Sequence, residues 1–91
     1  MTIADEAQTV LELELCGKLA DVGGAFVKTV IPAEGCSVAE LFAMVARQHP
    51  ALAPSLDASR IRACVNEAVV APNARVMPGD EVALFPPVSG G

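Results

Sequence analysis

The sequence predicts a small α+β domain in which a mixed sheet of four or five strands packs against one main helix. Three observations lead to this fold class: an alternating segment near the start, a capped amphipathic segment in the middle, and short β-branched segments separated by turn residues in the second half. A chain of 91 residues forms one domain and buries roughly 60–65% of the surface that its unfolded form exposes. One modest core is expected.

Composition constrains both the core and the partners. The chain is 53% hydrophobic but has no Trp, no Tyr and three Phe, so the core should be aliphatic. No apolar run approaches the ~18 residues that span a bilayer, and the start of the chain lacks a signal segment, so we expect a soluble, cytoplasmic protein with no membrane contact. The net charge of −5 argues against nucleic acid, which requires clustered Lys and Arg. An acidic domain favours a partner protein with a basic surface.

The first strand is predicted by strict alternation. Residues 1–8 are polar and predict a flexible leader. From residue 9 to 16, leucines occupy every second position, while Glu12 and Glu14 occupy the positions between them. This period of two marks a strand with one buried face.

A second strand is predicted after a loop. Residues 17–24 read as a loop that ends in a Gly-Gly pair. Residues 25–31 are rich in β-branched side chains and are followed by Pro32, which favours a strand that stops there. A hairpin is the natural connection between the two strands.

The main helix has the sharpest local signal. Ser37 and Glu40 have the spacing of a capping box, and Cys36 and Leu41 stand at the positions of a hydrophobic staple. The next apolar residues recur at helical spacing and predict one buried face: Val38, Leu41, Phe42 and Val45.

The helix should end near Gln48 or His49, because Pro50 disfavours helical geometry in the residue before it. His49 is interpreted as a helix-capping or surface residue, at the end where a partly protonated imidazole interacts favourably with the helix dipole. Residues 51–59 are predicted to be loop with a short turn.

The second half predicts three strands joined by two turns. Asn tolerates positive φ, and Pro followed by Gly at central positions indicates a type II turn. The predicted elements are a strand over 61–65, a turn at Asn66-Glu67, a strand over 68–71, a turn over 77–80 and a last strand over 81–85. The order β-β-α-β-β-β over residues 9–85 outlines the β-grasp, or ubiquitin-like, fold, and other small α+β domains share this outline.

Searching for catalytic motifs returns nothing. No phosphate-binding glycine loop, zinc-helix motif or nucleophile elbow is present. Three cysteines (Cys16, Cys36 and Cys64) and one histidine give no metal-ligand spacing; the cysteines are interpreted as reduced, half-buried or buried small hydrophobes. We therefore expect no metal, no bound cofactor and a protein that is not catalytic by itself.

The end of the chain carries the chemistry that the rest lacks. The last strand runs into Pro86 and Pro87, which cannot extend a strand ladder and favour extended geometry. Residues 86–91 are predicted to be an extended tail that could reach on the order of 20 Å. Side chains then shrink from Val88 and Ser89 to Gly90 and Gly91. A segment without side chains fits a narrow tunnel in another protein.

A terminal carboxylate is a poor electrophile until its charge is neutralised. Adenylation by ATP converts it into an acyl phosphate anhydride, and a sulfur nucleophile then leaves a thiocarboxylate. The carrier itself needs no catalytic side chains for this chemistry. The tail therefore predicts a functional arm whose reacting group is the carboxylate of Gly91, with two terminal glycines that arose by chance or as a remnant as the alternative.

The same residues resemble a known family. The segment 65–67, Val-Asn-Glu, followed by 78–91, Pro-Gly-Asp-Glu-Val-Ala-Leu-Phe-Pro-Pro-Val-Ser-Gly-Gly, resembles MoaD, the small subunit of molybdopterin synthase. Its members typically carry a V-N-x turn and a terminal G-D-E-V-A-F-F-P-P-V-x-G-G. Over the rest of the domain the resemblance is one of element order and pattern, which thiamine sulfur carriers (ThiS) share.

The resemblance implies a cycle. An E1-like enzyme of the MoeB type would use ATP to adenylate Gly91, and a persulfide source would supply the sulfur. The tail would enter a MoaE-like large subunit and donate sulfur to a cyclic pyranopterin precursor, forming the dithiolene of molybdopterin for molybdenum cofactor biosynthesis. Gly91 carries the reacting group and Gly90 the steric freedom. The residues expected to contact the partners are Phe85, Pro86, Pro87, Val88 and Ser89; for Phe85 a plain core position is the equal alternative.

Three departures from the family pattern concern the partners. Leu84 stands where Phe is frequent, the loop after the first strand lacks the usual aromatic and arginine (Lys18 could supply the charge), and the leader is extra. Three other functions stay open: a sulfur carrier for thiamine or cysteine synthesis, a protein modifier that joins Gly91 to target lysines, and a non-covalent binding module with an idle tail. The stretch 85–87 disfavours the thiamine carrier.

Overall fold

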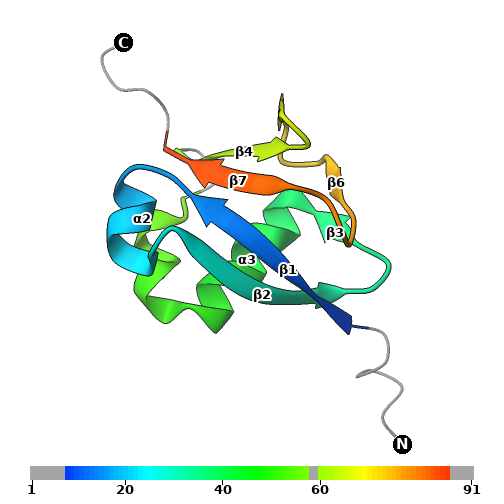
Figure 1. Cartoon of the computed structure of the whole chain (residues 1–91), viewed down its shortest axis with the longest axis horizontal. Coiled ribbons are helices and arrows are strands. Elements are labelled where there is room, and N and C mark those ends of the chain that lie inside the picture. Colours follow the sequence, from blue (N-terminus) through cyan, green and yellow to red (C-terminus); the bar gives the residue numbers. More distant parts are fainter. Residues whose placement is uncertain (1–7, 58–59, 87–91) are drawn as a thin grey trace, which may run out of the picture.

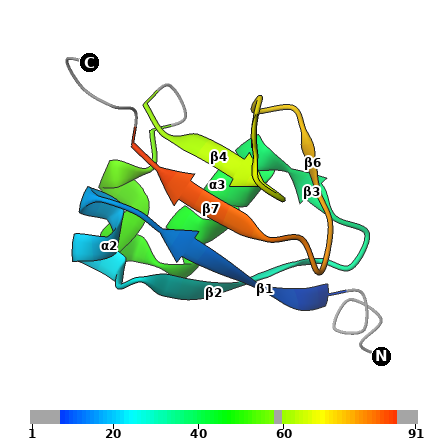
Figure 2. The ribbon, with the colours of Figure 1, turned by 45° about the horizontal axis from the view of Figure 1, so that its top comes forward.

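The first and last strands lie side by side within a five-stranded sheet, and helices cover one of its faces (Figures 1 and 2). The structure is a computed structural model that describes residues 8–57 and 60–86. The strand order is β2-β1-β7-β4-β5, and a two-stranded sheet pairs β3 with β6. The predicted mixed sheet on one main helix is confirmed.

The elements follow in chain order, with strands and helices numbered as in Figure 1. They are β1 (Gln8–Leu15), α2 (Lys18–Gly23), β2 (Phe26–Pro32), β3 (Cys36–Ser37), α3 (Val38–Gln48), the 3-10 helix η1 (Pro50–Ser55), β4 (Arg62–Val65), β5 (Ala68–Val70), β6 (Arg75–Val76) and β7 (Val82–Phe85).

The predicted hairpin of the first two strands forms as expected. β1 pairs antiparallel with β2 in a register that runs from Gln8 opposite Pro32 to Glu14 opposite Phe26. The leucines of β1 are buried, and Glu12 and Glu14 are exposed. The strand begins one residue earlier than predicted, at Gln8, because this residue already pairs with β2.

The prediction of a loop over residues 17–24 was wrong, because this segment contains helix α2. Leu19 is only 1% exposed, so the segment contributes to the core. A Cβ atom at Gly23 would lie 2.9 Å from a methyl group of Leu15, which shows how closely α2 approaches β1. A helix of six residues is too short to show a 3.6-residue period in the sequence. The glycines on either side of it are residues typical of loops and turns, so they favoured the wrong interpretation.

Helix α3 confirms the capping box. The Ser37 hydroxyl oxygen accepts a hydrogen bond from the Glu40 backbone N–H at 3.0 Å, and the Glu40 carboxylate accepts one from the Ser37 N–H at 2.8 Å. All four residues of the predicted apolar face are buried: Val38, Leu41, Phe42 and Val45. Cys36, at the predicted staple position, is buried with them.

The helix ends at Gln48, with His49 as its C-cap. The imidazole Nε2 of His49 lies 2.8 Å from the Lys28 carbonyl oxygen on β2, so the ring bonds to the sheet. The segment after it, predicted to be loop with a short turn, forms the 3-10 helix η1, which begins at Pro50. Leu52 is buried there, which explains why the segment is ordered against the core.

The strands of the second half match the prediction. β4 and β5 form a hairpin through Asn66 and Glu67, both of which have positive φ (51° and 73°). The predicted type II turn is present: Gly79 has a φ of 90°, and the Asp80 N–H bonds to the Met77 carbonyl at 3.0 Å. The short pair β3–β6 was not predicted, because two-residue strands leave no periodic signal.

The start of β7 is fixed by side chains of the two turns. The Asn66 side-chain oxygen accepts a bond from the Glu81 N–H at 2.9 Å, and its NH₂ group donates to the Asp80 carboxylate at 3.1 Å. The other Asp80 oxygen accepts from the Met77 N–H at 2.7 Å. These bonds tie the β4–β5 turn to the turn that leads into β7.

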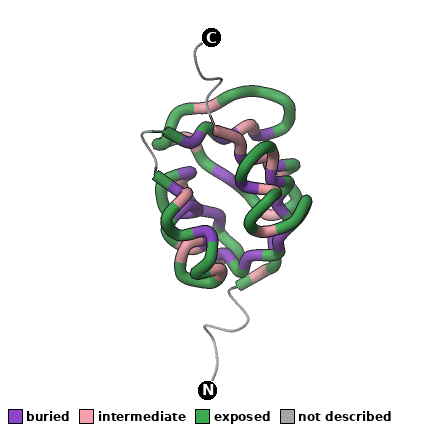
Figure 3. The backbone as a smooth tube through the Cα atoms, turned by 90° about the vertical axis from the view of Figure 1, so that its left-hand side faces the viewer, coloured by how far each residue is buried: buried purple, intermediate pink, exposed green. Residues whose placement is uncertain are grey.

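The core is aliphatic, as the composition predicts. Figure 3 shows the buried positions toward the interior and the exposed ones around the outside. The largest fully buried side chains come from six elements: Leu13, Leu19, Ile31, Leu41, Leu52 and Leu84. Among the three Phe, only Phe42 belongs to this core. No helix in residues 8–57 and 60–86 is long and apolar enough to cross a membrane.

The first prediction concerns Asn66. The Asn66→Gly variant keeps the positive φ accessible but removes the side-chain bonds to Asp80 and Glu81, so the free energy of unfolding should fall by about 1–2 kcal/mol. Glu67→Gly is the matched control, because it relieves a positive φ and should raise stability by about 1 kcal/mol. Urea unfolding of both variants checks the pair. Equal effects of the two changes would contradict the role of the Asn66 side chain.

The second prediction concerns pH. Hydrogen bonds from Ser37, its backbone N–H first, lower the pKa of Glu40. A carboxyl with a depressed folded-state pKa stabilises the fold above its unfolded-state pKa, and this contribution disappears as the pH falls through the folded-state pKa. In Glu40→Gln the loss of stability should be greatest at neutral pH and vanish in acid. Denaturant titrations of Glu40→Gln and the unaltered protein, from neutral pH into acid, test this prediction. A difference in the free energy of unfolding that grows as the pH falls would contradict it.

Candidate functional site

The base of the C-terminal tail lies where β7 ends beside the turn that connects β1 to α2 (Figure 1). β7 runs parallel to β1, with Leu15 opposite Leu84. The Cys16 N–H continues this ladder by donating to the Leu84 carbonyl at 3.0 Å. On its other side β7 pairs antiparallel with β4, and Arg62 lies opposite Phe85. The last residues of the domain are therefore held between two strands.

Phe85 is not a core residue. Val82 and Leu84 are buried, whereas Ala83 and Phe85 are half-buried. Side chains alternate between the two faces of a strand, so Phe85 and Leu84 lie on opposite faces of the sheet. Leu84 faces the helices, and Phe85 lies on the face that the helices do not cover. This position keeps it available for the predicted contact with partners.

Pro86, the last described residue, is positioned by Gly17. A Cβ atom at Gly17 would lie 3.3 Å from Cγ and 3.5 Å from Cδ of the Pro86 ring. Gly17 also has a φ of 60° and a ψ of −134°, a conformation that only glycine adopts readily. The same residue therefore starts α2 and makes room for the first residue of the tail.

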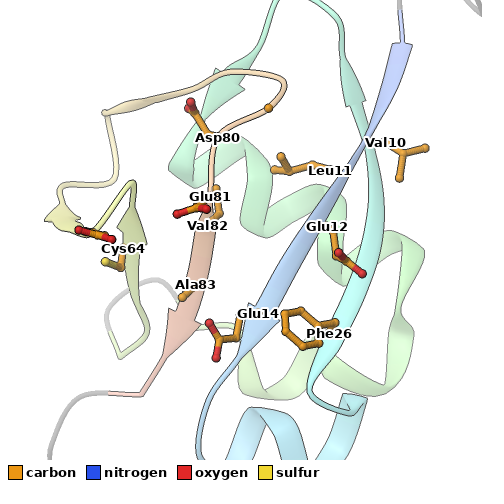
Figure 4. Close-up of a pocket in the computed structure, with 12 residues that line it drawn as sticks. Val10, Leu11, Glu12, Glu14, Phe26, Cys64, Asp80, Glu81, Val82 and Ala83 are labelled. Atoms are coloured by element: carbon orange, nitrogen blue, oxygen red, sulfur yellow. The ribbon is translucent and has the colours of Figure 1, made fainter.

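The open face of the sheet leads up to this point. The pairing registers place five residues in one row across the strands: Phe26, Glu14, Ala83, Cys64 and Val69. Figure 4 shows Phe26 and Glu14 beside each other in the groove that runs over β1 and β7. Phe26 is 58% exposed, a large apolar surface for so small a domain. The sequence analysis did not predict that Phe26 is exposed. The period of two on β2 places Phe26 on the same face as Lys28, and this was a signal that could have indicated it.

The groove on this face is acidic. No Lys or Arg among the described residues lines it. Carboxylates from three separate segments do: Glu12, Glu14, Glu67, Asp80 and Glu81. Glu12 lies opposite Lys28 at the side of the groove. The face thus combines negative charge with apolar side chains, which suits a partner that carries basic groups.

Two of the three cysteines, Cys16 and Cys36, are not activated nucleophiles. All three are free, with Cys36 buried and Cys16 and Cys64 half-buried, as interpreted from the sequence. Burial, and then the negative charge of Glu14, raises the pKa of the Cys16 thiol. Burial, and then Glu40, raises the pKa of Cys36. A raised pKa leaves less of the reactive thiolate at neutral pH.

Other predicted site residues are placed as follows. Lys18 is exposed in the first turn of α2, directly after Gly17. Pro87, Val88, Ser89, Gly90 and Gly91 lie outside the described residues. Within residues 8–57 and 60–86, no group of His, Cys, Asp and Glu is arranged to hold a metal ion.

Comparison with known proteins identifies the family. The model of the ThiS family matches residues 5–91. Among solved structures, SAMP1 from Haloferax volcanii is 31% identical, with a TM-score of 0.74, over 91% of this chain and 100% of that one. A search of curated proteins finds no match.

Two further structures share the fold at lower identity. Subunit 1 of a molybdopterin converting factor from Pyrococcus furiosus has a TM-score of 0.70 and 21% identity, over 88% of this chain and 99% of that one. Subunit 1 in a complex with subunit 2 of the same factor from Helicobacter pylori has a TM-score of 0.57 and 23% identity, over 91% and 100%. The chain belongs to the ThiS family and has the ubiquitin-like, β-grasp fold that it shares with these structures.

Proposed function

We propose that this chain is a sulfur carrier that works as the small subunit of molybdopterin synthase, with the carboxylate of Gly91 as its reacting group. The observation that carries the proposal is the anchored base of the tail. β7 is held by β1 on one side and by β4 on the other, and Pro86 rests against Gly17. The residues that follow are the Pro-Val-Ser-Gly-Gly sequence that ends in the proposed reacting group.

The proposed chemistry needs a partner enzyme and ATP. The Gly91 carboxylate attacks the α-phosphorus of ATP in an E1-like, MoeB-type enzyme and releases pyrophosphate. The outer sulfur of a persulfide then attacks the carbonyl carbon of the acyl adenylate, and AMP leaves. A thiol cleaves the resulting acyl disulfide by forming a disulfide with the donor sulfur, and the thiocarboxylate remains on Gly91.

A large subunit is the proposed recipient of the loaded tail. The Helicobacter pylori neighbour is described as a complex of subunits 1 and 2 of a molybdopterin-converting factor, which supports a MoaE-like partner for this chain. The tail residues 85–89 would contact it, with Phe85 on the open face of the sheet. The acidic groove beside Phe85 favours a partner surface with Lys or Arg, so association should weaken as salt rises.

The loading reaction tests the proposal directly. The protein ending at Gly91 is incubated with a MoeB-type enzyme, ATP and a sulfur donor, and its intact mass is measured. We expect an increase equal to the replacement of one oxygen by one sulfur, and subsequent transfer of that sulfur to a cyclic pyranopterin in the presence of the large subunit.

The controls are two chains altered only at the tail. One lacks Gly91 and the other carries one extra residue after it. Both should stay unloaded and keep the thermal midpoint of the unaltered protein, because the core is built from residues before Pro86. No mass increase in the protein ending at Gly91, or an increase in the extended chain, would refute the proposal.

Gly17 provides a further prediction for the same assay. Gly17→Ala strains a positive φ and crowds Pro86, so it should lower stability by about 1–2 kcal/mol and slow loading of Gly91. Gly24→Ala is the matched control: its φ is also positive, at 88°, but a Cβ there meets nothing within 4 Å. It should cost similar stability and leave the loading rate unchanged. Equal loading rates in both variants would show that the Pro86 contact does not direct the tail.

A protein modifier is the second candidate function. SAMP1 from Haloferax volcanii is 31% identical to this chain over 91% of its length, and a second structure of 28% identity is described as small archaeal modifier protein 1 from that species. A modifier would use the same adenylation of Gly91 and then form an amide with a target lysine.

Immunoblots of lysates from cells expressing the tagged protein separate the two candidates. A ladder of conjugates that disappears on deletion of Gly91 supports the modifier. A thiocarboxylate without conjugates supports the carrier.

A further inference from the structure

The outer edge of β2 is the long open edge of the main sheet. β2 ends the strand order on one side and spans seven residues, whereas β5, on the other side, spans three. Edge strands present unpaired N–H and C=O groups to any further strand, and proteins block long ones by specific devices. An edge strand as long as β2 is therefore expected to have groups that block pairing with a further strand.

The register identifies the backbone groups on this edge. The Leu15 N–H bonds to the Ala25 carbonyl at 2.8 Å, and hydrogen-bonded pairs alternate with non-bonded pairs along an antiparallel ladder. The pairs of β1 with Phe26, Lys28 and Val30 are consequently the non-bonded ones. The N–H and C=O groups of these three residues point away from β1.

Gln48 occupies this edge at Val30. Its side-chain oxygen accepts from the Val30 N–H at 2.8 Å, and its NH₂ group donates to the Val30 carbonyl at 2.9 Å. A carboxamide carries the same donor and acceptor as a peptide group. The last residue of α3 thus makes, with one side chain, the pair of bonds that the backbone of an added strand would make.

Neighbouring groups extend the block along the strand. His49 Nε2 lies 2.8 Å from the Lys28 carbonyl, so this nitrogen carries the proton and donates. The Pro32 carbonyl accepts from the Gly35 N–H at 2.9 Å, and Pro32 has no N–H to offer. From Lys28 to Pro32, every edge carbonyl of β2 that points outward has a partner.

Without this block the strand is suited to pairing with itself. It reads Phe-Val-Lys-Thr-Val-Ile, with one charge, and it exposes 58% of Phe26 and 38% of Val30; such apolar, weakly charged segments add readily to other strands. Antiparallel pairing about a two-fold axis at Thr29 sets Lys28 of each copy opposite Val30 of the other, so like charges do not face each other.

Charge also favours this edge over the rest of the surface. The groove between β2 and α3 is lined by two arginines, Arg47 and Arg75, and two glutamates, Glu34 and Glu40, so it has no net charge. The charged side chains that line the groove over β1 and β7 are all carboxylates. Two copies of a chain with a net charge of −5 therefore repel each other less along β2 than across that acidic groove.

We propose that the side chains of Gln48 and His49 form an edge clasp on β2, and that this clasp keeps the chain monomeric by excluding β2 of a second copy. The excluded partner is a second copy of this chain, because a two-fold arrangement pairs the unpaired N–H and C=O groups of the β2 edge on both chains at once. The clasp must release Val30 and Lys28 before pairing begins.

Gln48→Ala removes both side-chain bonds to Val30. Gln48→Glu removes only one of them, because an ionised carboxylate accepts from the Val30 N–H but donates nothing to the Val30 carbonyl. Arg47→Ala is the matched control, one residue earlier on α3 and without a bond to β2 among the described residues. Sedimentation equilibrium should show self-association at least about tenfold stronger in Gln48→Ala, with Gln48→Glu also above the unaltered protein and Arg47→Ala equal to it.

Hydrogen exchange locates the contact. In the unaltered protein the Val30 amide should exchange more slowly than the outward-pointing Lys28 amide. In Gln48→Ala it should exchange fast when dilute and regain protection when concentrated. Adding Val30→Pro to Gln48→Ala removes an outward N–H without removing a bond to β1, and should restore the monomer. An unprotected Val30 amide in the unaltered protein, a monomeric Gln48→Ala variant at all concentrations, or a dimer that persists with Val30→Pro would each overturn the proposal.

Discussion

The parallel pairing of β1 with β7 is the interaction on which the rest of the structure depends. It brings the beginning and the end of the domain together in the interior of the sheet, so that the closing strand is supported on both sides. Parallel neighbours require a long crossover, and here that crossover contains every helix and the remaining strands. The position of Pro86 against Gly17 follows directly, because the ladder of β1 and β7 delivers both residues to the same edge of the sheet.

The motif that identifies the family has a structural role at its first part. Asn66 and Asp80 contribute no chemistry to the proposed reaction; their side chains join two turns and set the point at which β7 begins. In the second part of the motif, Leu84 is buried and Phe85 is half-buried. The residues that support the last strand therefore directly precede the residues proposed to contact partners.

Local signals predicted the elements that are encoded locally. Alternation over β1, the capping box of Ser37 and Glu40, and the positive-φ turn at Asn66 each depend on neighbours within a few residues. Helix α2 and η1 were missed, because burial of Leu19 and Leu52 against each other's elements holds them in place and no window of sequence contains both.

The site was predicted unevenly for the same reason. The tail residues, which stay a prediction, are contiguous and could be proposed from sequence, whereas the row from Phe26 to Val69 is assembled from five strands: β2, β1, β7, β4 and β5. The orientation of Phe85 needed the register of β7, because an apolar residue at the end of a strand fits either face equally well from sequence alone. The edge clasp is a contact between residues 18 positions apart and left no pattern to read.

The shared direction of β1 and β7 has a practical consequence for anyone handling this protein. Gln8 and Phe85 lie at opposite ends of neighbouring parallel strands, and the eight residues of β1 separate these ends by about 25 Å. A fluorophore or an affinity handle joined ahead of Gln8 is attached at the far pole of the domain from Pro86. A label attached at Gln8 is therefore remote from Phe85 and Pro86, so assays of the proposed loading reaction and pull-downs can use the same preparation.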